Sequence, residues 1–247
     1  MGDIHGHSSY VDGTSSVGDI VDHGIKKGLR VIGVTDHQSC RSAREVLELS
    51  DGDGFIPCVG AELESQWSVE SRPFHTIIAQ FGEKTTPAFL NDLERCTQTI
   101  PLLGEALRMV KNHDALLLFP HPGVYPIKGI PFSVLDRFCR GLDPEPKLNI
   151  GIETKNWMVK MFVGTEPIYA YFAELMAAKH CLARFGSSDY HFGEHIGKQS
   201  TVFPIDCFSG EAVMETIKRK RIYPHDGSSM SVLTLLKLGL FVAKRNI

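Results

Sequence analysis

The sequence predicts an α/β barrel, closed or distorted, in preference to an open sheet. Short β-rich runs alternate with helical patterns along the chain, which is typical of parallel strand–helix–strand units. Six or seven such units fit into 247 residues, an ordinary size for one α/β barrel. No internal repeat or low-complexity linker divides the chain, so we expect a single domain over residues 1–247.

The predicted strands are apolar and β-branched runs with the length of buried strands. They cover residues 29–35, 55–63, 74–81, 116–119, 148–153 and 182–186. Any strand near the start of the chain is very short, because only Met1 and Gly2 precede the polar Asp3. Either the barrel is irregular at this point or the native protein begins further upstream.

Helical patterns occupy the intervals between these strands. They cover residues 17–27, 42–49, 87–111, 132–139, 166–179 and 210–219. The motifs that carry chemistry lie within 3–198, and 199–247 is expected to supply the last strand and the C-terminal helices. The apolar run 230–243 contains Lys237 and is too short to span a bilayer. We expect it to be a terminal helix packed on the barrel, with an oligomer contact as the alternative.

Charge and cysteine content restrict the class of partner. With 26 basic and 29 acidic residues, the net charge of -3 offers no broad basic surface for long nucleic acid or a membrane. A nucleotide or a short oligonucleotide in a local positive pocket remains compatible with this balance. The six cysteines are scattered without a CxxC pair, which indicates reduced thiols. Because the chain also has no apolar start, a cytoplasmic location is expected.

A pair of histidines opens the chain. In the sequence Asp3-Ile4-His5-Gly6-His7, the two imidazoles are two residues apart, and Asp12 follows in a turn. On an extended segment, positions i and i+2 point to the same face, so both rings can bind one cation. The same spacing occurs in chance surface pairs, and a lone pair of this kind does not establish a metal site.

Further metal-ligand residue types lie in or directly after other predicted strands. They are His37 after 29–35, Glu62 at the end of 55–63, His75 in 74–81, His121 after 116–119, and Asp189 and His191 after 182–186. The carboxyl ends of the strands of a parallel barrel converge at one mouth, where active sites lie. A histidine at a strand end is usually a hydrogen-bonded structural residue, but the repeated placement here predicts a metal centre.

The ordered motifs resemble those of the PHP (polymerase and histidinol phosphatase) family. They are DIHGH followed by DG, then TDH, GAELE, the histidine in the strand 74–81, PHPG and GSSDYH, and they extend from Asp3 to about Lys198. The resemblance implies a distorted (βα)7 TIM-like barrel that binds two to three divalent metal ions. Some members of the family have lost ligands and are structural modules, whereas all nine ligand positions here carry a competent side chain.

The resemblance also implies an assignment of the nine ligands. The first metal would be held by His5, His7, Glu62 and Asp189. Glu62 would bridge to a second metal, held also by His75 and His121. The third metal would be held by Asp12, His37 and His191. Mixed imidazole and carboxylate ligands suit zinc, manganese or iron, and the ligand types do not discriminate between these metals.

This ligand set is suited to phosphate ester hydrolysis. Three divalent cations would outweigh three carboxylates, and the remaining positive charge suits a phosphate dianion. Metals roughly 3.5–4 Å apart can activate a bridging hydroxide and stabilise a leaving oxygen. No G-x-S-x-G elbow of a serine hydrolase occurs in the sequence.

Other polar residues near the strand ends are candidates for supporting roles. Arg41, Lys155 and Lys198 are candidate substrate-binding residues, with a solvated surface charge as the alternative for each. His195 is a candidate general acid for the leaving oxygen, and together with Asp189 it forms the candidate catalytic pair.

Two acidic residues and one loop complete the candidates. Asp3 and Asp36 neighbour ligand histidines and can accept hydrogen bonds from imidazoles, with strand-end caps as the alternative. The segment 66–74, with Trp67 and Arg72, is a candidate rim loop over the site.

The leading functional hypothesis is a metal-dependent phosphatase. It would hydrolyse the phosphomonoester of a small metabolite or nucleotide, histidinol phosphate included, by attack of a metal-bridging hydroxide. The alternatives are a nuclease or phosphodiesterase on short nucleic acid, a non-catalytic PHP module of a larger assembly, and a metal-dependent hydrolase of C–N bonds. A nuclease needs a basic track with aromatic platforms, whereas the one dense basic run, 218–221, is typical of a solvated helix end. The expected partner is a small phosphorylated substrate, with no membrane and no long nucleic acid, and the oligomeric state is left open.

Overall fold

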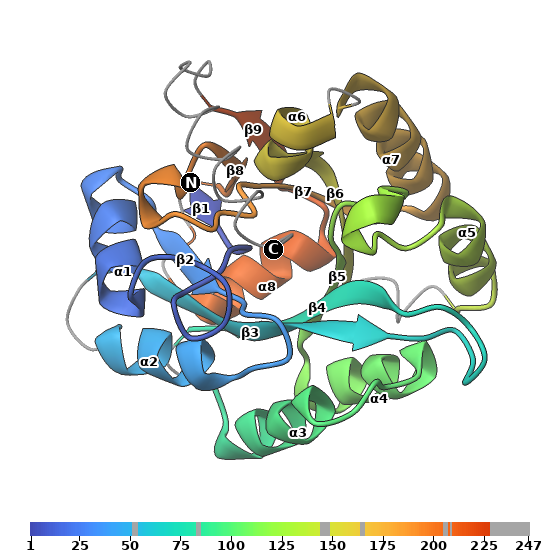
Figure 1. Cartoon of the computed structure of the whole chain (residues 1–247), viewed down its shortest axis with the longest axis horizontal. Coiled ribbons are helices and arrows are strands. Elements are labelled where there is room, and N and C mark those ends of the chain that lie inside the picture. Colours follow the sequence, from blue (N-terminus) through green and yellow to red (C-terminus); the bar gives the residue numbers. More distant parts are fainter. Residues whose placement is uncertain are drawn as a thin grey trace, which may run out of the picture.

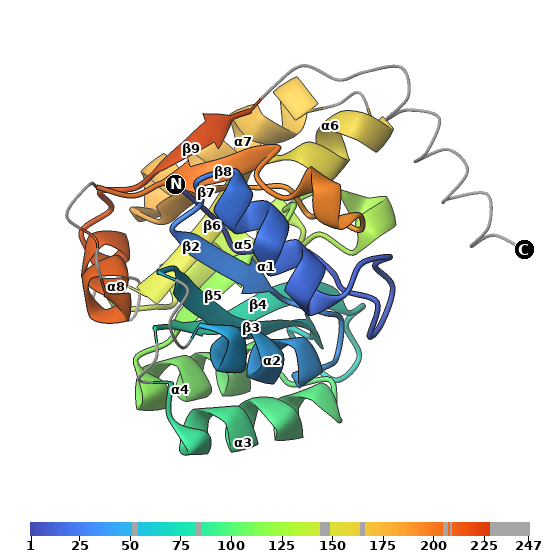
Figure 2. The same cartoon turned by 90° about the vertical axis from the view of Figure 1, so that its left-hand side faces the viewer.

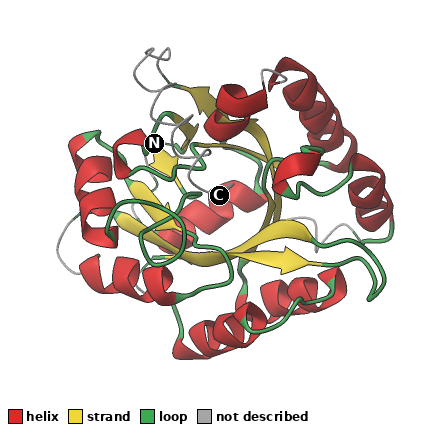
Figure 3. Ribbon diagram, in the orientation of Figure 1, coloured by secondary structure: helices red, strands yellow, loops and turns green. Residues whose placement is uncertain are grey.

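A mixed β-sheet curls around the centre of the molecule, with helices on its outside (Figure 3). The computed structural model describes residues 1–50, 54–82, 85–143, 149–163, 166–204, 207 and 209–227. In these residues the strands are β1 (Gly2–Asp3), β2 (Val31–Val34), β3 (Ile56–Ser65), β4 (Phe74–Phe81), β5 (Leu116–Phe119), β6 (Ile150–Asn156), β7 (Ala183–Ser187), β8 (Gln199–Val202) and β9 (Tyr223–Asp226). The predicted strands correspond to β2 to β7, with small differences at their ends.

The strand directions differ from a uniformly parallel barrel. The sheet order is β7-β6-β5-β4-β3-β2-β1-β8-β9. β1, β2 and β3 are parallel neighbours, as are β5, β6 and β7. β4 is antiparallel to both β3 and β5, and β8 is antiparallel to both β1 and β9. The expectation of parallel units throughout is therefore wrong at β4, because no helix separates β3 from β4 and the chain turns back directly.

The two ends of this sheet approach each other and nearly close the barrel. The Gly186 N–H on β7 donates to Thr201 Oγ1 on β8 at 3.1 Å, and the Thr201 hydroxyl donates to the Gly186 carbonyl at 2.9 Å. A Cβ added to Gly186 would lie 2.5 Å from the Ser200 carbonyl oxygen, so a larger residue would force β7 and β8 apart. The predicted distorted α/β barrel is confirmed, and the short β1 is one of its irregular strands.

The helices are α1 (Val17–Lys26), α2 (Arg41–Leu49), α3 (Pro87–Thr97), α4 (Leu103–His113), α5 (Phe132–Arg140), α6 (Trp157–Val163), α7 (Glu166–His180) and α8 (Gly210–Lys218), with short 3-10 helices η1 (Tyr125–Ile127) and η3 (Gly193–His195). Helices α1 to α7 lie around the barrel, and α8 lies across its middle in this view (Figure 1). The single helix predicted over 87–111 is two helices. Pro101 explains this, because proline disfavours helical geometry in the residue before it and has no N–H for the helix ladder.

The alternation of side chains along β3 separates the core from the polar centre. Val59, Ala61 and Leu63 belong to the apolar layer beneath α3 and α4. Cys58 belongs to a second apolar cluster inside the barrel, and successive residues of a strand alternate between faces, so Glu62 shares the face of Cys58. The barrel interior therefore changes along β3 from apolar to acidic.

Helix α8 closes the apolar end of the barrel. Its Val213, Met214 and Ile217 belong to the same buried cluster as Cys58 and Ile77. Figure 2 shows α8 at the end of the barrel opposite the loop that follows β1. One end is thus packed with hydrophobic side chains, which leaves the other end for polar groups.

The region after β7 contains more strand than expected. Instead of one last strand it supplies β8 and β9, with α8 between them. The apolar run 230–243 lies outside the described residues. No helix in the described part of the chain is long and apolar enough to cross a membrane.

Candidate metal centre

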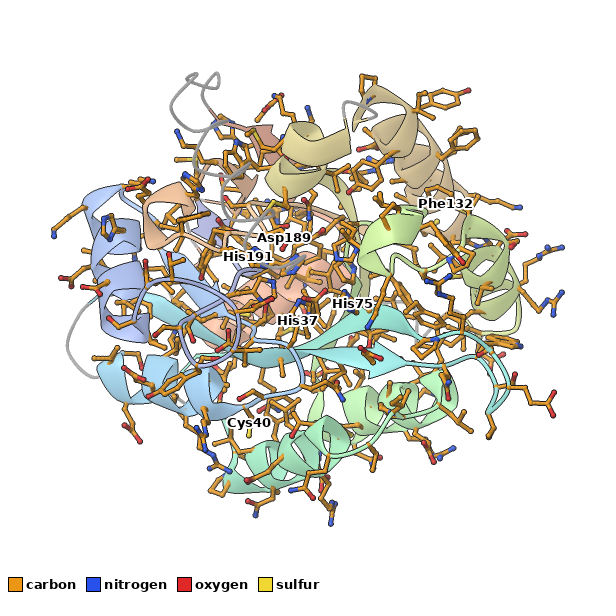
Figure 4. All side chains as sticks on the ribbon, in the orientation of Figure 1. His37, Cys40, His75, Phe132, Asp189 and His191 are labelled. Carbon is orange, nitrogen blue, oxygen red and sulfur yellow. The ribbon has the colours of Figure 1, made fainter. Side chains whose placement is uncertain are left out.

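The nine predicted ligands lie together at the polar end of the barrel. His5, His7 and Asp12 follow β1, His37 follows β2, Glu62 is on β3, His75 is on β4, His121 follows β5, and Asp189 and His191 follow β7. Figure 4 shows His37, His75, Asp189 and His191 gathered around the middle of this end. The barrel thus brings together residues that are far apart in sequence, such as His5 and His191, which are separated by 186 positions.

His75 belongs to the site for a reason that a uniformly parallel barrel would not provide. It is the second residue of β4, at the amino end of the strand, whereas Glu62 lies in the carboxyl-terminal half of β3 and the other ligands follow the carboxyl ends of their strands. Because β4 is antiparallel to β3, the register places His75 opposite Glu64, two residues from Glu62. The reversed strand direction thus brings an amino end to the mouth of the barrel.

Two ligand-bearing segments pair directly with each other. The His7 N–H donates to the Tyr190 carbonyl at 2.7 Å, and the Asp189 N–H donates to the His5 carbonyl at 3.0 Å. Gly6 lies against the buried Tyr190, and a Cβ at position 6 would be 2.3 Å from the Tyr190 ring. Only glycine fits at position 6, because any side chain there would overlap the Tyr190 ring. The backbone pairing places His5 and His7 beside Asp189 and Tyr190.

The first group consists of His5, His7, Glu62 and Asp189. His5 Nε2 lies 3.3 Å from Glu62 Oε2 and 3.5 Å from Asp189 Oδ1. His7 Nε2 lies 3.4 Å from Glu62 Oε2 and 3.2 Å from Asp189 Oδ1. Ligands about 2.0–2.1 Å from a tetrahedral zinc ion are separated by roughly 3.3–3.4 Å. These four nitrogen-to-oxygen distances therefore match the spacing of ligands around one cation.

The second group shares Glu62 with the first. Glu62 Oε1 lies 2.8 Å from His75 Nδ1 and 3.2 Å from His121 Nε2, while Oε2 faces the first group. His37 Nδ1 is also 3.1 Å from Glu62 Oε2. One fully buried carboxylate thus directs its two oxygens to two adjacent sets of imidazoles, which is the geometry of a bridging ligand.

The third group consists of Asp12, His37 and His191. Asp12 Oδ2 lies 3.7 Å from His37 Nε2 and 3.4 Å from His191 Nε2. His7 Nδ1 is 3.5 Å from Asp12 Oδ1, so the His7 ring lies between the first and third groups. One ligand atom from each member, together with His7, falls within 4.8 Å of the others.

Two family models match the parts of the chain that contain most of the predicted ligands. The family model described as PHP domain matches residues 3–115, which contain six of the nine predicted ligands. The chain belongs to the PHP family. A second model, described as PHP-associated, matches residues 169–222, which contain Asp189 and His191. No curated protein matches the chain.

Solved structures of other proteins share the PHP fold of this chain. One is a two-domain protein from Bacteroides vulgatus containing a predicted PHP-like metal-dependent phosphoesterase, with a TM-score of 0.66, 17% identity and 92% of this chain covered. An amidohydrolase from Chromobacterium violaceum with bound sulfate has a TM-score of 0.61 and 16% identity, covering 90% of this chain and 97% of its own. A lesion-specific endonuclease from Pyrococcus furiosus has a TM-score of 0.57 and 18% identity, covering 88% of this chain and 55% of its own.

The chain spans 64% of the length of the Bacteroides protein. At these identities the likeness shows the fold alone. Family membership and the grouped histidines and carboxylates together indicate a metal-dependent hydrolase.

Electrostatics in the PHP site favour the metal-binding forms of Glu62, Asp189 and His37. Burial raises the pKa of Glu62, but nearby imidazoles, His75 foremost, outweigh it and hold the pKa well below the usual carboxyl value. The pKa of Asp189 is likewise raised by burial and lowered further by neighbouring histidines, with a net value well below normal. Burial and adjacent imidazoles lower the pKa of His37 to about 3. Ionised carboxylates and neutral imidazoles are the forms that bind cations.

Glu153 on β6 is a functional candidate that the sequence reasoning missed. Its carboxylate is completely buried, and Oε1 lies 2.7 Å from His5 Nδ1. Oε2 accepts a hydrogen bond from the His121 N–H at 2.8 Å. The sequence could have identified Glu153 by its position at the end of the predicted strand 148–153, because the same kind of position identified Glu62.

Asp3 and Asp36 have partners other than the imidazoles they were expected to orient. Asp3 accepts hydrogen bonds from the N–H groups of Ser188 at 3.1 Å and Gly197 at 2.8 Å. Asp36 accepts from both the N–H and the hydroxyl of Ser8, each at 2.6 Å. Both carboxylates therefore hold the loops that carry the ligands, and Glu153 has the role of imidazole acceptor.

The remaining predicted residues lie around this cluster. The buried His195 ring is 4.6 Å from the Trp157 ring and 5.2 Å from the Phe192 ring, measured between centroids. Arg41 begins α2 with an exposed side chain, and Lys198 lies near Lys27, whose pKa is lowered by burial and by this second positive charge.

Lys155 is already engaged in an ion pair. Its Nζ is 3.4 Å from Asp226 Oδ2 on β9. The catalytic and substrate-binding roles of these residues remain predictions.

Proposed function

We propose that this PHP chain is a metal-dependent phosphatase for the phosphomonoester of a small metabolite or nucleotide. The observation that supports the proposal is the convergence of six imidazoles and three carboxylates in groups whose ligand atoms lie within 4.8 Å of one another. Two to three divalent cations, zinc, manganese or iron, would occupy these groups. Glu62, with one oxygen toward each of two groups, would be shared between two cations.

The residues present fit such cations. His75 Nδ1 lies 2.8 Å from Glu62 Oε1 but makes no hydrogen bond within the described part of the chain. His7 Nδ1, which lies 3.5 Å from Asp12 Oδ1, is likewise buried without a hydrogen-bond partner among the described residues. Buried polar nitrogens normally have partners, so ring atoms arranged this way suit an environment completed by cations.

The side chains of the site would prepare it for a phosphate. Divalent cations bound here would polarise the phosphoryl oxygens and lower the pKa of a water molecule. Glu62 and Asp189 have strongly lowered pKa values, so both keep their negative charge at neutral pH. The His37 side chain is 28% exposed whereas those of His5 and His7 are fully buried, so a substrate would approach from the side of His37.

We propose supporting roles for four further residues. His195 would protonate the leaving oxygen, with its ring orientation restricted by Trp157 and Phe192. Arg41, Lys155 and Lys198 would bind substrate phosphate or its neighbouring groups. Lys155 would have to exchange its ion pair with Asp226 for the substrate.

A specific contact favours a second candidate, a phosphodiesterase or nuclease on short nucleic acid. The Arg72 guanidinium carbon lies 4.1 Å from the centre of the Tyr125 ring, and Tyr125 is 62% exposed. The segments that carry this pair are linked to His75, because Lys128, three residues after Tyr125, accepts a hydrogen bond through its carbonyl from the His75 N–H at 2.8 Å. Exposed aromatic rings and arginine planes are the surfaces on which nucleobases stack. A nucleotide monoester would use the same surface.

The deciding experiment compares hydrolysis of p-nitrophenyl phosphate and bis(p-nitrophenyl) phosphate at equal concentration, with zinc, manganese and iron tested separately. Sugar phosphates, nucleotides, histidinol phosphate and short oligonucleotides extend the panel, and metal content is measured on the same sample. We expect faster hydrolysis of the monoester, loss of activity with a chelator, and recovery on adding metal. A several-fold preference for the diester with every metal would support the second candidate and contradict the first.

A matched variant separates the two substrate classes. Tyr125→Ala removes the exposed ring but leaves the grouped ligands unchanged. If bases stack on Tyr125, this variant should raise the KM for nucleotides and leave p-nitrophenyl phosphate hydrolysis unaltered. A metal-loaded protein that hydrolyses no ester in the panel would contradict both candidates and favour a non-catalytic module of a larger assembly.

A further inference from the structure

Glu153 connects three strand ends that carry proposed metal ligands. Its Oε1 contacts His5 Nδ1 at 2.7 Å and accepts a hydrogen bond from the Ser187 hydroxyl. Its Oε2 accepts from the His121 N–H and from Asn156 Nδ2, both at 2.8 Å. The carboxylate is completely buried, and all four contacts come from groups that can donate.

These contacts determine which nitrogen of His5 faces the cation. A carboxylate that already accepts from a backbone N–H, an amide and a hydroxyl acts as an acceptor toward His5 as well. The His5 Nδ1–H therefore donates to Glu153, which leaves Nε2, 3.3 Å from Glu62 Oε2 and 3.5 Å from Asp189 Oδ1, as the nitrogen that would bind a cation. An imidazole whose other nitrogen donates to a carboxylate has a fixed orientation and is a more basic ligand.

Asn156 extends the same network to Asp189. Its Oδ1 accepts from the Val159 N–H at 3.0 Å, so its amide nitrogen must face the carboxylates. That nitrogen lies 2.8 Å from Glu153 Oε2 and 3.2 Å from Asp189 Oδ2. Asn156 thereby ties Glu153 to a second carboxylate of the first group.

Two of the ligands held by this network have an unfavourable backbone geometry. His121 has φ 30° and Asp189 has φ 49°, both in the left-handed region that residues other than glycine rarely adopt. The hydrogen bond to the His121 N–H holds the first, and the amide of Asn156 contacts the side chain of the second. These contacts therefore help to hold both ligands in conformations that their residue types rarely adopt.

We propose that Glu153 is a positioning residue for the metal centre, and that it acts through His5, His121 and the amide of Asn156. It would set the His5 tautomer for the first group and hold His121 in the second group. The inference rests on the metal binding in the proposed function and is independent of the substrate. It predicts that a neutral residue at position 153 weakens cation binding while the barrel stays folded.

The test uses the zinc-loaded protein with Glu153→Gln, Glu153→Asp and the control Thr154→Val. Gln has the same shape as Glu but presents an NH2 group to donors, so it cannot accept from all of them. Thr154 is the next residue on β6, is fully buried, and its hydroxyl has no hydrogen-bond partner among the described residues. Thr154→Val therefore controls for general damage to this strand. Zinc affinity is measured by competition with a chromophoric chelator, with circular dichroism as the folding check.

We expect Glu153→Gln to bind zinc about 10–100-fold more weakly, the usual effect of losing the partner of a ligand histidine. Glu153→Asp should recover part of this loss because it restores the acceptor charge, and Thr154→Val should match the wild type. Equal affinity in wild type and Glu153→Gln would overturn the proposal. Equal losses in Glu153→Gln and Thr154→Val would also overturn it, since they would show only strand damage.

A spectroscopic measurement on the wild-type protein tests whether Glu153 sets the His5 tautomer, even if Glu153→Gln does not fold. In ¹⁵N-histidine-labelled, zinc-loaded protein, His5 should bind zinc through Nε2 and show a slowly exchanging proton on Nδ1. Coordination through Nδ1, or a rapidly exchanging Nδ1 proton, would refute the role of Glu153. A chain that binds zinc but hydrolyses no phosphate ester would contradict only the proposed function, whereas a chain that binds no cation would overturn both.

Discussion

Replacement of Glu62 by glutamine tests the shared carboxylate at the centre of the site. The Glu62 side chain is fully buried, and its oxygens lie 2.8 to 3.4 Å from the nitrogens of five imidazoles. Glu62→Gln would keep the shape of the side chain, but it would remove one negative charge and replace one oxygen by a nitrogen that cannot bind a cation. Because each oxygen faces a different group, both groups should be affected.

The size of the effect follows from burial and shared contacts. Removing one partner of a buried ionic cluster costs about 3–5 kcal/mol. At about 1.4 kcal/mol per tenfold change, this corresponds to roughly 10²- to 4 × 10³-fold weaker cation binding at the affected groups. The fold should be little affected, since the glutamine keeps the shape of the side chain and bound cations would replace its charge interactions with the imidazoles. We therefore expect hydrolysis below about 1% of the wild-type rate at limiting metal, by the same conversion.

Glu64→Gln is the matched control for Glu62→Gln. It makes the same chemical change two residues further along β3, on the same face of the strand, where Glu64 pairs with Lys128. A partly exposed ion pair of this kind contributes about 0–1 kcal/mol, so metal content and turnover should stay near the wild-type values. Metal content by elemental analysis and turnover of p-nitrophenyl phosphate are compared at matched circular dichroism. A Glu62→Gln protein that keeps wild-type metal content and turnover would refute the bridging role.

Three further predictions concern metal content, packing and pH dependence. Fully loaded protein should contain about three divalent metals per chain, and a chain that stays empty when supplied with zinc, manganese and iron would contradict this. Gly6→Ala should destabilise the protein by about 1–3 kcal/mol in urea unfolding because its Cβ would meet the Tyr190 ring. Gly104→Ala on α4, where the Cβ meets nothing within 4 Å, should instead be neutral or stabilising, and equal effects would argue against the close approach. The pH prediction concerns Asp136, whose pKa is lowered to about 2 by hydrogen bonds from Lys179 and His180. Its stabilising contribution is present above the ordinary carboxyl pKa of about 4 and is lost as the pH falls toward 2, so Asp136→Asn should flatten the pH dependence of unfolding in that interval. An unchanged acid limb in the variant would contradict it.

The local features of the site could be predicted from the sequence. The spacing of His5 and His7 places both imidazoles beside the same Glu62 oxygen, and the apolar runs correctly identified most strands of the barrel. Polar residues at the ends of those runs pointed to the positions of the ligands. These predictions succeed because side-chain alternation and strand propensity depend on residues that are close in sequence.

The tertiary structure alone decided how these local pieces combine. The antiparallel direction of β4, which brings His75 to the mouth, depends on pairing with β3 and β5. The hydrogen bond between His5 and Glu153 joins residues 148 positions apart, so no spacing rule can reveal it. Likewise, Asp3 and Asp36 hold loops because of where those loops pass in the folded chain. Strand pairing and buried hydrogen bonds are set by packing over long sequence separations, and local sequence patterns do not encode which partners meet.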